Sequence, residues 1–143
     1  GFELALSDTT GMALPRHVKS LSAQAIKAFG RHATFTFHGH DTAGFGVANV
    51  LAAMDAGIRS FDGSVGGLGG CPFAPGATGN IAIEDLAYLF ARMGIETGID
   101  LEKLFKAGDI AVKLPGAVTG GHARNIPRNR LFDDGAAYTA RKA

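Results

Sequence analysis

The sequence contains a single cysteine and no apolar run long enough to cross a bilayer. Cys71 has no partner for an internal disulfide, so the chain is not a disulfide-stapled domain and a reducing compartment is expected. The formal net charge is only +1, which gives no field that would favour a nucleic acid or a membrane as a partner. The chain does have 46% apolar and 19% charged residues, a composition typical of a folded globular protein.

Short alternating segments and longer segments with helical spacing follow one another along the chain. Turn residues end the expected strands, which are 2–7, 33–37 and 58–62. Apolar residues recur at helical spacing in the expected helices, which are 15–29, 47–54, 81–93 and 101–107. Pro15 suits a first helical position, whereas Gly30 and Gly57 suit the position just after a helix. This order predicts an α/β fold with a parallel sheet.

The periodic pattern stops near Gly108. We therefore expect one folded unit over residues 1–108 and a C-terminal extension over residues 109–143 that is loop-rich or poorly ordered. The extension carries basic residues among Gly, Pro and Asn, so it is either a solvated terminus or a contact for an anionic ligand. Because the chain starts at Gly1 and enters a strand-like segment almost at once, we expect a fragment of a longer protein.

Two histidines follow the second expected strand, in the segment His-Gly-His-Asp-Thr at 38–42. Residues two apart in a strand point to the same face, so His38 and His40 are candidates to bind one metal ion. By the same alternation Phe35 and Phe37 point away from them, toward helices. The alternative is a pair of partly exposed histidines at the end of a strand.

Asp8 ends the first expected strand in the same way that the histidines end the second. In parallel α/β folds the carboxyl ends of the strands share one face, so Asp8 is expected to lie near His38 and His40. The alternative is that Asp8 only forms an Asx turn or caps the following helix.

A stretch rich in glycine, from Gly66 to Gly79, follows the third expected strand and contains Cys71. Glycines permit unusual dihedrals and close backbone approach, whereas Pro72 and Pro75 limit the shapes of the loop. The stretch matches neither a phosphate-binding P-loop nor a GxGxxG pattern. It predicts a mobile lid with a reactive thiol, and the alternative is an inert, buried cysteine.

Asn80 precedes the helix that is expected to start at Ile81. It is a candidate N-cap, and its amide oxygen is also a candidate ligand for a hard cation. Glu84 and Asp85 fall in the first turn of that helix, where they complement the helix dipole or support a neighbouring ligand.

Together these motifs resemble the hydroxymethylglutaryl-CoA lyase family, from about Leu6 to Gly108. The most diagnostic stretch is Gly-Leu-Gly-Gly-Cys-Pro at 67–72, with Gly-Ala-Thr-Gly-Asn at 76–80 downstream. Asp-Thr-Thr-Gly at 8–11 and His-x-His-Asp-Thr at 38–42 lie at the expected separations. The resemblance implies a TIM (β/α)8 barrel, of which this chain supplies roughly the last three βα units plus a C-terminal extension.

The resemblance also implies the site. His38, His40 and Asn80 would bind Mg²⁺ or Mn²⁺, and a fourth ligand, an aspartate, would come from the first strand of the barrel. Asp8, His38 and Cys71 would be catalytic, with Cys71 on a flexible loop that closes over the substrate.

The implied reaction cleaves a carbon–carbon bond in a 3-hydroxyacyl-CoA. The substrate would be 3-hydroxy-3-methylglutaryl-CoA, giving acetyl-CoA and acetoacetate, or a relative such as citramalyl-CoA. The expected partners are the acyl-CoA, the missing N-terminal part of the barrel and a second copy in a homodimer. The expected compartment is the cytoplasm, or the mitochondrial matrix in a eukaryote.

Three alternatives stay open. Enzymes that condense an acyl-CoA with a 2-oxo acid share the two histidines, although they generally lack the cysteine loop. A truncated barrel could keep the histidines and perform no turnover. Asp-Thr-Thr-Gly-Met at 8–12 also departs from hydroxymethylglutaryl-specific members, which usually have isoleucine after the Asp-Thr pair, so the acyl group is open.

Overall fold

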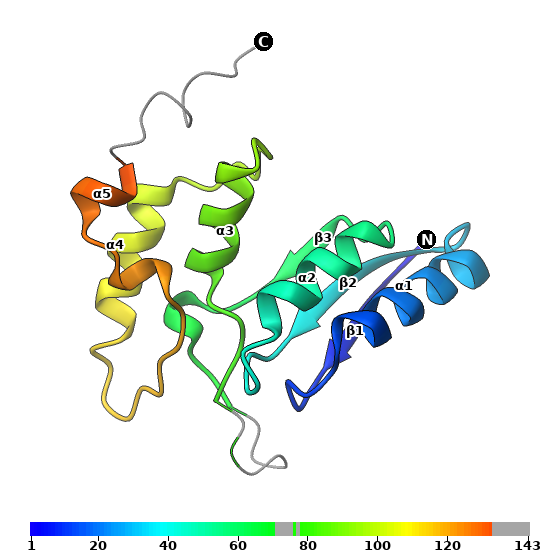
Figure 1. Cartoon of the computed structure of the whole chain (residues 1–143), viewed down its shortest axis with the longest axis horizontal. Coiled ribbons are helices and arrows are strands. Elements are labelled where there is room, and N and C mark those ends of the chain that lie inside the picture. Colours follow the sequence, from blue (N-terminus) through cyan, green and yellow to red (C-terminus); the bar gives the residue numbers. More distant parts are fainter. Residues whose placement is uncertain (71–75, 77, 133–143) are drawn as a thin grey trace.

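The structure, a computed structural model, describes residues 1–70, 76 and 78–132. Within them, parallel strands lie in the order β1-β2-β3, and α1 and α2 run alongside this sheet (Figure 1). The strands are β1 (Phe2–Asp8), β2 (Ala33–Gly39) and β3 (Ser60–Asp62). The helices are α1 (Pro15–Phe29), α2 (Gly46–Asp55), α3 (Ile83–Arg92), α4 (Leu101–Ala111) and α5 (Arg128–Phe132), with 3₁₀ turns η1 (Val65–Gly67) and η2 (Ala123–Asn125). The predicted α/β fold with a parallel sheet is confirmed.

The alternation predicted for β2 divides the sheet into an apolar and a polar face. Phe35 and Phe37 are buried on the side of the helices. On the other face, Thr36 Oγ1 lies 2.8 Å from Ser60 Oγ of β3 and 3.2 Å from Glu3 Oε1 of β1, within hydrogen-bonding distance of both. The register pairs Thr36 with Ser60, and Glu3 reaches Thr36 from the position opposite Thr34, so polar side chains from all three strands meet on this face.

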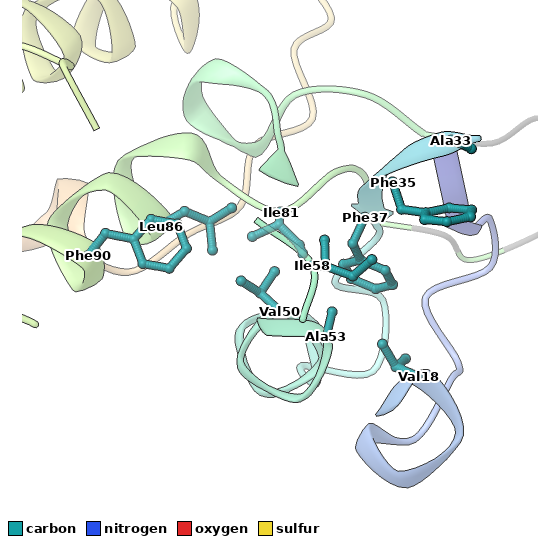
Figure 2. Packing of buried hydrophobic residues seen from close by; sticks show 10 residues of the cluster. All are labelled: Val18, Ala33, Phe35, Phe37, Val50, Ala53, Ile58, Ile81, Leu86 and Phe90. Atoms are coloured by element: carbon teal, nitrogen blue, oxygen red, sulfur yellow. The ribbon is translucent and has the colours of Figure 1, made fainter. Parts of the chain in front are cut away.

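The main core lies between the apolar face of the sheet and the helices (Figure 2). Val50 and Ala53 of α2 are fully buried in it, and Phe37 is 3% exposed. Burying one such large side chain contributes roughly 1.5–3 kcal/mol, so this layer fixes the strands that position the site. Its buried members are Val18, Ala33, Phe35, Phe37, Val50, Ala53, Ile58, Ile81, Leu86 and Phe90.

The two glycines expected after helices behave differently. Gly57 follows α2 with φ +110°, a left-handed conformation that side chains rarely adopt. Gly30 directly follows α1 as its C-cap, but with φ −61° it does not adopt the left-handed conformation that is common for a glycine after a helix. A Cβ at Gly30 would lie 2.6 Å from the carbonyl oxygen of Ile26, so close packing rather than its dihedral favours glycine there.

Helical structure continues beyond Gly108, where the sequence predicted loop or poor order. The helix α4 extends to Ala111, and α5 follows at Arg128–Phe132. A second core joins this segment to α3 and α4, because Ala123 and Leu131 pack with Phe105. The sequence did not predict this structure because the contacts that stabilise it leave no periodic pattern of apolar residues. The domain boundary at 108 remains a prediction, and residues 133–143 lie outside the described residues.

Among the described residues, no helix combines the length and the apolar character needed to cross a membrane. The helices α3, α4 and α5 form a group beside the sheet with its helices α1 and α2 (Figure 1). The glycine-rich stretch after β3 connects these two parts of the chain.

Candidate metal and catalytic site

The carboxyl ends of the three strands carry the candidate side chains. Asp8 is the last residue of β1, His38 lies one residue before the end of β2, and Asp62 ends β3. The parallel register pairs His38 with Asp62. The strand ends therefore share one edge of the sheet, as the sequence predicted, and the third strand adds a carboxylate to it.

The two histidines lie side by side. Their ring centroids are 5.3 Å apart, with the ring planes 73° to each other. Each Nδ1 has a partner that accepts hydrogen bonds: Asp62 Oδ1 lies 2.6 Å from that of His38, and the Thr9 carbonyl oxygen 2.5 Å from that of His40. Because a carboxylate and a carbonyl only accept, each Nδ1 carries a proton, and Nε2 is the nitrogen with a lone pair when the ring is neutral. This is the usual arrangement of histidines that bind a metal ion.

Asn80 lies against His40, because the two residues form an isolated antiparallel bridge. Its amide nitrogen donates to the Leu68 carbonyl oxygen at 2.9 Å. Its Oδ1 is buried and has no hydrogen-bond partner within the described part of the chain. Leaving a buried carbonyl oxygen unpaired is costly, and a cation would satisfy it.

Asn80 is not the N-cap of the following helix, which was its simplest explanation from sequence. The helix α3 begins at Ile83, and Ala82 is its N-cap. Residues 80–82 remain extended because they pair with neighbouring strand ends: Ile81 donates to the Gly39 carbonyl at 3.1 Å, and Ala82 forms a bridge with Ser64.

The donor set fits a divalent cation. Two imidazole nitrogens and one amide oxygen are available from His38, His40 and Asn80, and such mixed nitrogen and oxygen donors suit Mg²⁺ or Mn²⁺. Within the described part of the chain, His, Cys, Asp and Glu side chains form no group of three or more that could hold a metal. A cation held by the two histidines would therefore also need the amide oxygen of Asn80.

The carboxylate of Asp8 is held by the loop between β1 and α1. Its Oδ1 accepts from the Gly11 and Met12 amides at 3.0 and 3.3 Å, and its Oδ2 accepts from the Ala13 amide at 3.0 Å. The Asx-type turn that the sequence left open is therefore present. Oδ2 makes only one of these bonds, so it keeps a lone pair for another donor.

Cys71 lies outside the described residues, but the stems of its loop are described. Gly79 has φ +117°, and a Cβ there would come within 2.7 Å of the carbonyl oxygens of Gly67 and Gly69. Only glycine allows the two stems to approach so closely. The carboxylate of Glu84, fully buried, accepts from the Gly66 amide at 2.8 and 2.9 Å and fixes the first stem.

Two features of the site were missed in the sequence. Asp62 was read only as the end of a strand, although its place after β3 is the same signal that singled out Asp8 and His38. Glu84 was expected to complement the helix dipole or to support a neighbouring ligand, and no local pattern shows that it reaches Gly66. Asp85 of the same turn accepts from the His122 and Ala123 amides instead.

Three parallel βα units with polar residues at the carboxyl strand ends define part of a TIM barrel with a candidate metal site. Residues 2–111 match the HMGL-like family, and the chain belongs to this family.

Curated relatives match it in sequence. The (R)-citramalyl-CoA lyase of Chloroflexus aurantiacus is 51% identical over 107 residues, which are 75% of this chain and 33% of that protein. The hydroxymethylglutaryl-CoA lyase of Bacillus subtilis is 46% identical over 105 residues, 73% of this chain and 35% of that protein. The chain thus spans about a third of the length of these relatives.

A solved structure matches in both sequence and fold. It is an HMG-CoA lyase of Acinetobacter baumannii in complex with coenzyme A and 3-methylmalate, with a TM-score of 0.79 and 44% identity. The match covers 87% of this chain and 41% of that one.

Proposed function

We propose that the protein carrying this chain is a divalent-metal-dependent lyase that cleaves a 3-hydroxyacyl-CoA. The observation that carries the proposal is the set of three donors at the strand ends. His38 and His40 have their Nδ1 atoms in hydrogen bonds, which makes Nε2 the nitrogen that could bind a cation, and Asn80 Oδ1 is buried without a partner among the described residues. The relatives named as acyl-CoA lyases support the same chemistry.

His38, His40 and Asn80 would hold Mg²⁺ or Mn²⁺. A bound cation would supply electrostatic stabilisation of the negative charge that develops on the substrate oxygen. The fourth protein ligand, an aspartate, would come from the part of the barrel outside this chain. Asp62 and the Thr9 carbonyl would keep the two imidazoles in the tautomer that leaves Nε2 free.

Asp8 is the residue that we assign to proton removal. The cleavage requires loss of the C3-hydroxyl proton, breakage of the C2–C3 bond and protonation of C2 in the acyl-CoA enolate that leaves. The free lone pair of Asp8 Oδ2 would accept the first proton. The resemblance also makes His38 catalytic. However, when Nδ1 of His38 donates to Asp62, its Nε2 cannot bind a metal ion and accept a proton at the same time.

Cys71 would protonate the enolate, directly or through water, after its loop has excluded bulk solvent. The glycines at the loop stems support a loop with a fixed base, since Gly66 is bonded to Glu84 and Gly79 packs against the opposite stem. The role of the thiol rests on the family resemblance.

Two acyl groups are candidates, and each has a relative in its favour. One is 3-hydroxy-3-methylglutaryl, from the lyases at 44–46% identity, and the other is citramalyl, from the lyase at 51% identity. Coenzyme A in the Acinetobacter baumannii complex supports a thioester substrate for either. A homodimer remains part of the proposal.

Acetyl-CoA release tests this function. The full polypeptide, incubated with Mn²⁺, should release acetyl-CoA from 3-hydroxy-3-methylglutaryl-CoA or citramalyl-CoA, and the release should stop with a chelator. Release from neither thioester, while condensation of acetyl-CoA with a 2-oxo acid proceeds, would favour a condensing enzyme. No reaction in either direction would favour a barrel without turnover.

A further inference from the structure

The loop between β1 and α1, residues 9–13, connects the two halves of the candidate site. Its amides at Gly11, Met12 and Ala13 hold the Asp8 carboxylate. Its first residue supplies the carbonyl oxygen that accepts from His40 Nδ1. The conformation of this loop therefore sets both the place of Asp8 and the orientation of the His40 ring.

One buried side chain from another element holds the far end of this loop. Asn49 lies in α2 and is 1% exposed. Its amide nitrogen donates to the Ala13 carbonyl oxygen at 2.9 Å, across 36 residues of sequence. Ala13 therefore accepts from Asn49 through its carbonyl and donates to Asp8 through its amide, so the asparagine is two hydrogen bonds from the Asp8 carboxylate.

The environment of Asn49 does not favour asparagine for stability. Its neighbours in α2 include the buried Val50 and Ala53, and asparagine forms helices less readily than alanine. Its Oδ1 is buried and none of the described residues bonds to it, so half of the amide is desolvated without compensation from them. What the residue provides is one N–H group directed at the loop.

We propose that Asn49 is a positioning residue, which fixes the β1–α1 loop and through it both the His40 imidazole and the Asp8 carboxylate. The catalytic part of this inference rests on the proposed function. Its metal-binding part rests on the metal site that the same proposal assigns to His38, His40 and Asn80. Without the Asn49 bond, Ala13 can move, the Asp8 carboxylate loses its fixed orientation, and the Thr9 carbonyl is less well held against His40.

The test compares Asn49→Leu and Asn49→Ala with the unaltered full polypeptide. Leucine keeps the volume and removes the donor, whereas alanine also removes the volume. Ser22→Ala is the matched control, because Ser22 is also 1% exposed in a helix and its hydroxyl has no partner in residues 1–70, 76 and 78–132. Mn²⁺ affinity without substrate and the separate kcat and KM for acyl-CoA cleavage are the readouts, with circular dichroism to check folding.

Both Asn49 variants should weaken Mn²⁺ binding about tenfold and lower kcat at least as much, with KM for the thioester little changed. Ser22→Ala should change neither. The proposal is overturned if the Asn49 variants match Ser22→Ala in Mn²⁺ affinity, or if neither variant folds, since Asn49 would then be structural. Failure of the proposed function looks different: the unaltered protein would then bind Mn²⁺ and cleave no thioester, while the affinity comparison would still decide the role of Asn49.

Discussion

Asp62 Oδ1 lies 2.6 Å from His38 Nδ1, and the two residues are register partners on neighbouring parallel strands. The side chain of Asp62 is half exposed and that of His38 is 31% exposed, so their value as a surface ion pair is small. The pair matters because it decides which nitrogen of His38 carries the proton.

Removing the carboxylate should therefore impair metal binding more than stability. Asp62→Ala should weaken Mn²⁺ affinity by about 10- to 100-fold, because nothing then holds the His38 ring in the correct tautomer. Asp62→Asn, which can still accept from Nδ1, should show a smaller loss. Asp55→Asn is the control, since that exposed carboxylate pairs with Lys19 away from the site. Equal Mn²⁺ affinities in all three variants would show that Asp62 does not support metal binding.

Asn80→Ala should reduce Mn²⁺ affinity and also change the base of the glycine-rich loop. The substitution removes Oδ1, which has no partner among the described residues, and removes one of the donors to the Leu68 carbonyl, which also accepts from the Ser64 hydroxyl. Asn125→Ala is a suitable control, because its side-chain amide donates to the Gly121 carbonyl, at 3.4 Å, on an exposed segment. Titration of Mn²⁺ by electron paramagnetic resonance would measure both variants. Unchanged affinity in Asn80→Ala would show that its oxygen is no ligand.

Cys71→Ser should slow cleavage strongly and leave Mn²⁺ affinity nearly unchanged. The expectation follows from the assigned role, in which the thiol acts on the enolate and does not touch the metal ion. Single-turnover release of acetyl-CoA and metal titration would separate the two effects. A large loss of folding stability with normal turnover per folded molecule would instead support an inert, structural cysteine.

Asp85→Ala should destabilise the C-terminal segment without affecting metal binding directly. Its carboxylate accepts from the His122 and Ala123 amides at 2.7–3.0 Å, and its side chain is only 11% exposed. Losing these charge-assisted bonds should cost about 1.5–3 kcal/mol of unfolding free energy. Asp109→Asn, which breaks a more exposed pair with Arg128, should cost under about 1 kcal/mol. Urea denaturation would compare them, and equal losses would contradict this assignment.

Most of the fold was predictable because its signals are local. The alternation of Phe35 and Phe37 with polar residues identified both β2 and its buried face. The two histidines were found by the same alternation. The glycines also identified the stems of the loop. At Gly79 the glycine allows close contact with the backbone of the opposite stem, rather than with a ligand.

What the sequence did not predict depends on contacts between distant residues. From local sequence Asn80 is a candidate N-cap. In the structure the Ile81 amide donates to the Gly39 carbonyl, which keeps this segment extended. Likewise, residues after Gly108 show no periodicity, yet Asp85 holds Ala123 across 38 residues of sequence. Neither contact leaves a periodic signal, so local reasoning favoured a cap in the first case and a loop in the second.

The central claim is that His38, His40 and Asn80 hold a divalent cation that the lyase reaction requires. Titration of the metal-free full polypeptide with Mn²⁺, followed by electron paramagnetic resonance, tests it most directly. One saturable site per chain is expected in the unaltered protein and none in His38→Ala, which should also lose metal-dependent turnover. His32→Ala, which removes an exposed histidine in a turn, is the control and should bind normally. Equal Mn²⁺ binding by His38→Ala and the unaltered protein would contradict the claim.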